Sequence, residues 1–134
     1  MTYLNPAALA PPMGKFSHAT IVPAGHSIAF VSGQIGVDHD GALIGDNAFV
    51  QARQAFSNLD VIIRELGATP SDIVKMLTLV VGADGFGEFA RARDDVFAQW
   101  FPDGVYPAHS AATVSALAAP GLLVEIEAVV AVPQ

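Results

Sequence analysis

The fold is decided by residues 46–81, which read DNAFVQARQAFSNLDVIIRELGATPSDIVKMLTLVV. In the first half of this stretch, apolar side chains recur at the three- and four-residue spacing of an α-helix with one buried face. They are Ala52, Ala55, Phe56, Leu59, Ile62, Ile63 and Leu66. Asp46 or Asn47 can cap the start of this helix, and Gly67 stands where helices commonly end in a left-handed residue. After a short turn, the aliphatic and β-branched run at 73–81 predicts a strand.

The flanking segments predict more strands and a second helix. Residues 1–14 are rich in proline and alanine, so we expect them to be extended and irregular until docked. The second helix is expected to begin at Asp84, its cap, and to bury the stripe Phe86, Phe89, Val96, Phe97 and Trp100. Two strands are expected at 17–22 and 27–32, on either side of a turn at 23–26. The last two strands are expected at 109–115 and 122–132. The order ββαβαββ predicts a single α+β domain, residues 1–134, with two helices on one face of a mixed sheet.

The composition is unusually apolar for so short a chain. Hydrophobic residues make up 52% and charged residues 14%, against about 25% charged residues in an average domain. In the second expected strand, Ile28, Phe30 and Ser32 share one face, while Ala29 and Val31 share the other. Helices on one side of the sheet leave its second face open. We therefore expect a homo-oligomer that covers this face, with an alanine- and valine-rich monomer as the less favoured alternative.

Charge and cysteine content exclude several classes of function. The formal net charge is −7, and the few lysines and arginines are scattered, so the phosphates of a nucleic-acid partner would find no basic groove. The absence of cysteine excludes disulfides, thiolate catalysis and cysteine-ligated metal. The N-terminus lacks the features of a signal peptide, and no apolar stretch reaches membrane-spanning length. We expect a cytoplasmic protein with no membrane partner.

Six short segments together carry a family resemblance. They are 31–35 (VSGQI), 51–59 (QARQAFSNL), 66–68 (LGA), 72–75 (DIVK), 106–110 (YPAHS) and 124–128 (VEIEA). In this order and spacing they resemble the Rid/YjgF family of small imine deaminases over nearly the whole chain. The resemblance implies a chorismate-mutase-like α+β fold, a homotrimer with active sites in the clefts between subunits, and chemistry that needs no cofactor or metal.

The resemblance also assigns expected site residues in this sequence. Ser32 and Gly33 match residues that line the floor of the family's pocket, and Glu125 matches the acid thought to orient the attacking water. Two further positions depart from the family pattern: Phe16 stands where many members have tyrosine, and Asp94 where an asparagine from the neighbouring subunit is usual. The expected catalytic residues are thus Glu125, His109 and Ser32, and the expected substrate-binding residues are Phe16, Gly33, Asp94 and Ala111.

The most consequential departure is His109, which stands where deaminating members carry arginine. Arginine offers a permanent charge and a planar fork for a carboxylate, whereas histidine offers at most one bond in that direction. Because a charge-assisted hydrogen bond contributes about 1.5–3 kcal/mol, binding of a 2-imino acid should weaken about ten- to a hundredfold. Asp94, if ionised, would add to this effect. Two interpretations of His109 are open. It is either a general acid or base that Glu125 or Asp94 could keep protonated, or a tolerated polar residue without a role.

The sequence therefore predicts an enamine or imine hydrolase that acts on a small reactive metabolite, with altered substrate choice and weak activity on 2-imino acids. The alternative is a non-catalytic trimer, or accessory protein, that binds a small molecule in the cleft between subunits. Ribonuclease activity is disfavoured by the acidic charge. Asp38, His39 and Asp40 superficially suggest a metal site, but an exposed polar loop explains them better, and we expect no metal.

Overall fold

The computed structural model describes all 134 residues. Its elements, in chain order, are β1 (Thr2–Leu4), β2 (Ala19–Ile21), β3 (Ser27–Ile35), α1 (Ala48–Glu65), a short 3-10 helix (Pro70–Asp72), β4 (Ile73–Val81), α2 (Ala83–Trp100), β5 (Ala108–Val114) and β6 (Val124–Val132). No helix carries an apolar stretch of the length that a bilayer crossing would require.

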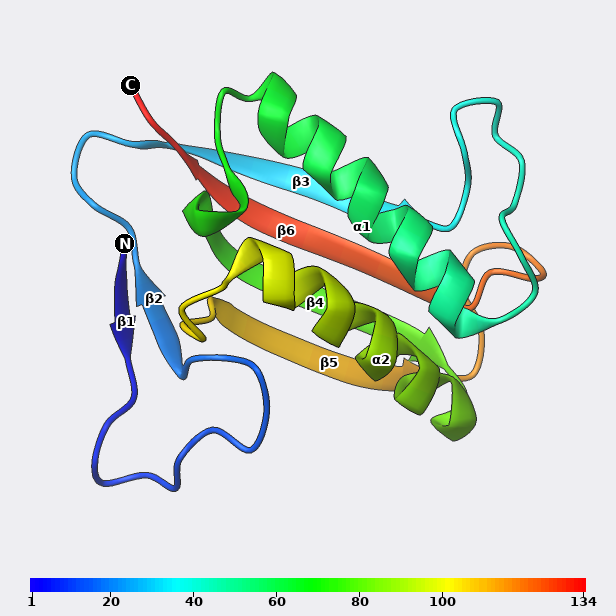
Figure 1. The fold of residues 1–134 in the computed structure, drawn as a ribbon, viewed down its shortest axis with the longest axis horizontal. Coiled ribbons are helices and arrows are strands. Elements are labelled where there is room, and N and C mark those ends of the chain that lie inside the picture. Colours follow the sequence, from blue (N-terminus) through cyan, green and yellow to red (C-terminus); the bar gives the residue numbers. More distant parts are fainter.

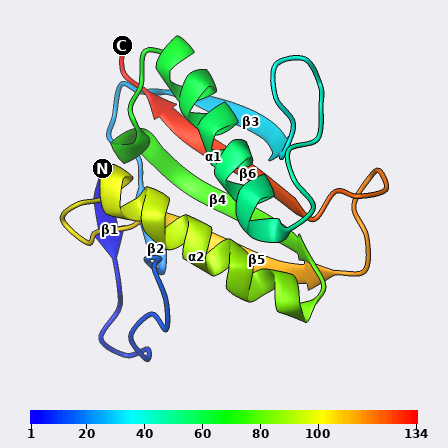
Figure 2. The ribbon, with the colours of Figure 1, turned by 45° about the vertical axis from the view of Figure 1, so that its right-hand side comes forward.

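The main sheet has four strands in the order β3-β6-β4-β5. β6 pairs antiparallel with both β3 and β4, whereas β4 and β5 are parallel and are connected through α2. Both helices lie on the same side of this sheet and run roughly along its strands (Figure 1). The turned view in Figure 2 shows the same two layers. The predicted α+β arrangement, with two helices on one face of a mixed sheet, is confirmed.

The core lies between the helices and the sheet. α1 contributes Phe56, Leu59 and Ile63, none more than 1% exposed, and α2 contributes Phe89 and Phe97. The ring of Phe56 lies 6.1 Å from that of Phe89 and 6.0 Å from that of Phe97, so the two helices meet through aromatic packing. Burying each such ring contributes about 1.5–3 kcal/mol, which explains why the predicted apolar stripes fix both helices.

The two helices begin and end as local chemistry dictates. Asn47 caps α1 by accepting a hydrogen bond from the backbone N–H of Val50, 2.9 Å away. Gly67, with φ of 71°, follows the last turn in the left-handed conformation that glycine adopts most easily. α2 begins two residues earlier than expected: Gly82 occupies the cap position, so Asp84 lies in the first turn and is not the cap.

The N-terminal segment differs from the sequence-based prediction. The expected strand at 17–22 is present as β2, but it pairs with β1 and not with β3 across the 23–26 turn. β2 instead docks beside β5: the backbone N–H of Ala108 donates to Thr20 Oγ1 at 2.8 Å, and Ser17 Oγ donates to the Tyr106 carbonyl at 2.6 Å. This docking places residues 13–16 over the end of α2 and β5 that forms the candidate site.

The open face of the sheet carries exposed apolar side chains. Phe30 is 83% exposed and Ile28 is 42% exposed, whereas Ala29 and Val31 pack against the core. The predicted alternation in β3 is therefore confirmed. β3 also continues beyond the predicted end at residue 32, because a break in register between Val31 and Gln34 absorbs Ser32 and Gly33 into the strand.

Candidate functional site

A pocket of about 650 Å³ lies between α2, β5 and the N-terminal segment. Its lining residues are Met13, Gly14, Lys15, Phe16, Phe86, Arg93, His109, Ser110 and Ala111. Three residues predicted from the sequence, Phe16, His109 and Ala111, thus come together here. The N-terminal segment supplies the wall opposite β5, which the expectation of an irregular segment at 1–14 did not reveal.

His109 faces the helix layer from β5. It stands in register with the buried Met76 of β4, and its imidazole lies 6.4 Å from the ring of Phe89 and 6.2 Å from that of Phe97. Burial lowers the pKa of His109 to about 4, and the positive charges of Arg93 and Lys75 act in the same direction. Within the single chain His109 is therefore neutral at pH 7, and no carboxylate of the same chain is hydrogen-bonded to its ring.

The hydrogen bond of His109 favours one tautomer of its neutral ring. Nε2 lies 2.8 Å from the hydroxyl of Thr78, a fully buried residue of β4. The Thr78 hydroxyl has no other acceptor, and a buried donor without a partner is costly, so it donates to Nε2. The proton of the neutral ring then resides on Nδ1, which has no partner within the chain. His109 can offer that N–H to a ligand.

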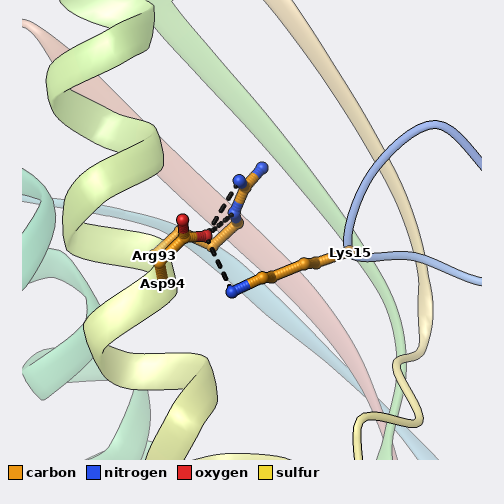
Figure 3. A network of polar contacts seen from close by, with 3 residues as sticks. All are labelled: Lys15, Arg93 and Asp94. Carbon is orange, nitrogen blue, oxygen red and sulfur yellow. Dashed lines mark hydrogen bonds and ion pairs between the residues drawn. The ribbon is translucent and has the colours of Figure 1, made fainter.

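A small charge cluster stands at the α2 side of the pocket (Figure 3). Oδ1 of Asp94 accepts hydrogen bonds from Arg93 Nε at 3.1 Å and Arg93 Nη2 at 2.9 Å, and Lys15 Nζ lies 3.2 Å from the same oxygen. Partial burial alone would raise the pKa of Asp94, but the hydrogen bonds and charges of Arg93 and Lys15 outweigh it and hold that pKa below its usual range. Asp94 is thus a carboxylate at the rim of the pocket, with both cations against it.

Arg93 is the site residue that sequence reasoning missed. It follows Phe86 and Phe89 of α2 by seven and four residues, the spacing of one helical face, so it lies on the stripe that the sequence had assigned to the core. Its side chain is only 18% exposed, and its guanidinium lies 5.9 Å from the Phe89 ring. The position of Arg93, a single arginine on an otherwise apolar helix face, could have identified it from the sequence.

A second group of predicted residues lies on the opposite face of the sheet. Glu125 of β6 alternates with Val124 and Ile126, which are both fully buried under the helices, so its side chain points to the open face. There it lies over Gly33 of β3. A Cβ built on Gly33 would stand 2.7 Å from Glu125 Cγ and Cδ, so the Glu125 side chain would have to move from this position if residue 33 carried a side chain. Glu125 has no hydrogen bond or ion pair within the chain, and Ser32, beside Gly33, is exposed.

One chain therefore presents two separate clusters. The pocket with Phe16, His109 and Ala111, and with Asp94 at its rim, lies on the helix side of the sheet, while Glu125, Gly33 and Ser32 occupy the open face. No group of three or more His, Asp and Glu side chains stands close enough to hold a metal ion. Asp38 instead accepts hydrogen bonds from the backbone N–H groups of Asp40 and Ala42, which shapes its loop.

Comparison with known proteins agrees with this architecture. The 2-iminobutanoate/2-iminopropanoate deaminase of Capra hircus is 33% identical over 125 residues, which cover 92% of this chain and 82% of the relative. Among solved structures, YyfB of Yersinia pestis, a protein of unknown function of the Rid family, matches with a TM-score of 0.81 and 33% identity over 97% of both chains. E. coli TdcF with bound serine matches with a TM-score of 0.70 and 25% identity over 98% of both chains.

A family model described as Endoribonuclease L-PSP matches residues 7–132, which is nearly the whole chain. The sequence segments, the helix-on-sheet architecture and these relatives all lead to the same assignment. The chain belongs to the Endoribonuclease L-PSP family, whose members are also called Rid/YjgF proteins.

Proposed function

We propose that this protein hydrolyses the C=N bond of a small imine, or of the enamine that tautomerises to it. The relatives named 2-iminobutanoate/2-iminopropanoate deaminase support this reaction class. We further propose that the protein acts as a homotrimer, in which the pocket of one copy meets the Glu125 surface of the next. The separation of the two clusters on opposite faces of one sheet supports a site shared between copies, because a single chain cannot bring them to one substrate.

The observation that carries the proposal is the Glu125 carboxylate over Gly33. Imine hydrolysis needs a water held beside the electrophilic carbon and a proton delivered to the departing nitrogen. A carboxylate that has no cation or donor within its own chain is free to accept a hydrogen bond from such a water. The missing Cβ at position 33 lets the Glu125 carboxylate lie close against the backbone of β3.

His109 sets the expected substrate choice. At pH 7 it is neutral, so it offers one N–H from Nδ1 where an arginine would offer a charged fork. We therefore propose weak turnover of 2-imino acids, whose carboxylate adjoins the reacting carbon. Replacing a charged pair of hydrogen bonds by one neutral bond should lower kcat/KM about ten- to a hundredfold.

Glu125→Gln tests the proposed reaction. An amino-acid oxidase generates the 2-imino acid in situ, and formation of the 2-oxo acid is followed above the spontaneous rate. Loss of a positioned acid–base group lowers the rate about a hundredfold or more, so Glu125→Gln should leave little beyond background. The matched control is Glu127→Gln, two residues along the same face of β6, which should retain wild-type activity.

His109→Arg tests the proposed specificity in the same assay. Its activity on 2-imino acids should rise about tenfold or more, and its thermal unfolding shows whether it has folded. Turnover equal to that of the wild type would contradict the role of His109. If the wild-type protein is stabilised by 2-oxobutanoate but never accelerates hydrolysis, the protein is instead a non-catalytic binder, the second function that the sequence suggested.

A further inference from the structure

The pocket is positively charged within a strongly acidic chain. Its lining contains Lys15 and Arg93 but no carboxylate, while the chain as a whole carries a net charge of −7. Asp94 at the rim offsets only one of the two cations, and His109 adds no charge at pH 7. A site with this balance favours a ligand that carries one negative charge.

Arg93 has donors to spare and is held in place. Of the five N–H groups of a guanidinium, the Nε and one Nη2 hydrogen are directed to Oδ1 of Asp94. The others have no acceptor within the chain. Asp94 on one side and the Phe89 ring at 5.9 Å on the other restrict the side chain, so little conformational freedom remains to be lost on binding.

We propose that Arg93 binds the acidic group of the ligand, a small carboxylate, from the α2 side of the pocket. Because Asp94 already engages the Nε and one Nη2 hydrogen of Arg93, this contact replaces only part of the charge that is missing from β5 at position 109. The Nδ1–H of His109 donates an additional neutral hydrogen bond. For the reaction that follows binding, the inference rests on the proposed function. It adds that an anionic substrate is accepted and that Arg93 of α2 binds its acidic group. Lys15 forms an ion pair with Asp94 and so lies on the same side of the pocket.

The test is a binding measurement, which does not depend on turnover. Titration calorimetry with 2-oxobutanoate, a stable analogue of an imino acid, is compared with 2-oxobutanamide, its uncharged counterpart. The wild-type protein should bind the acid at least about tenfold more tightly than the amide, because a charge-assisted contact is lost in the amide. Arg93→Gln should weaken binding of the acid about tenfold or more and leave binding of the amide unchanged.

Two further variants sharpen the result. Arg91→Gln removes the same charge from the same helix, but its guanidinium lies over Phe49, 4.9 Å from the ring and outside the pocket, so acid binding should be unchanged. Arg93→Lys keeps the charge without the fork and should bind the acid with intermediate affinity. Thermal unfolding of each variant verifies that it has folded.

The inference is overturned if Arg93→Gln binds the acid as tightly as the wild type, or if the wild type does not distinguish acid from amide. These outcomes are separate from a failure of the proposed function. Acid binding that depends on Arg93, without any hydrolysis in the wild type, would refute the proposed reaction and support the anion site.

Discussion

Acidification provides a direct test of how His109 is held. Its pKa in the folded protein is about 4, whereas an unperturbed histidine titrates near pH 6.5, and this gap is equivalent to about 3 kcal/mol. Because the folded pKa is lowered, the unfolded state binds more protons between these values. The contribution of His109 to stability is therefore complete above about pH 6.5, and it is lost as the pH falls toward 4.

The assay has two parts. NMR follows the His109 ring through the acid range and should report a midpoint well below that of an ordinary histidine. Urea unfolding at pH 7 and near pH 4 then compares the wild type with His109→Asn. The wild type should lose more stability on acidification than the variant does, by up to about 3 kcal/mol, because only the wild type must protonate a buried imidazole.

Arg93 provides an internal check on the cause. Burial is the largest contribution to the lowered pKa of His109, and the charge of Arg93 is the next. Arg93→Gln should therefore raise the His109 midpoint part of the way toward its ordinary value. A midpoint near pH 6.5 in the wild-type protein would refute the reasoning, because it would place the imidazole in water and not beneath Phe89 and Phe97.

Three more substitutions have defined outcomes. Gly33→Ala places a methyl group 2.7 Å from the Glu125 side chain and should lower imine hydrolysis about a hundredfold by displacing the carboxylate, as steady-state kinetics would show. Gln51→Ala removes the buried amide that joins Gly45, Gly121 and Leu123 and should lower the free energy of unfolding in urea by about 2–4 kcal/mol. Phe30→Lys places a charge on the open sheet face and should yield a smaller species in size-exclusion chromatography.

Matched controls exist for two of these. A Cβ on Gly87 meets nothing within 4 Å, so Gly87→Ala should leave activity intact. Val61 is 59% exposed on α1, on the helix side of the sheet, so Val61→Lys should leave the assembly size unchanged. If Gly33→Ala retained full activity, or if Phe30→Lys ran as the wild type does, the corresponding assignment would be wrong. For Gln51→Ala, an unchanged urea midpoint would count against the role of its hydrogen bonds.

Local patterns predicted the main layers well. The apolar run at Ile73–Val81 became β4 with the predicted bounds, and α1 ends before a left-handed Gly67 as expected. These features depend on periodicity and on single-residue conformational preferences, which sequence displays directly. The pairing of β2 with β1 could not be predicted in this way, because a local pattern can indicate a strand at 17–22 but does not say which strand it pairs with.

The sequence predicted some residues of the candidate site but not how they are arranged. Glu125, Gly33 and His109 stand in recognisable segments, but nothing in those segments shows that His109 and Glu125 face opposite sides of the sheet. That result depends on the register of β5 against β4 and of β6 against β4. Arg93 was missed because its role depends on the segment around Lys15, which is remote in sequence and reaches α2 only in the folded chain.

The central claim is that a working site takes its pocket from one copy of the chain and Glu125 from another. Mixing the subunits of two variants tests it most directly. One variant is Glu125→Gln, which keeps its pocket; the other is Ala111→Trp, which keeps Glu125 but fills the pocket. Each variant alone should be inactive. After equal amounts are unfolded and refolded together, about a quarter of the interfaces should pair an intact pocket with an intact Glu125, and activity should return to that extent. A mixture as inactive as its parents would contradict the account.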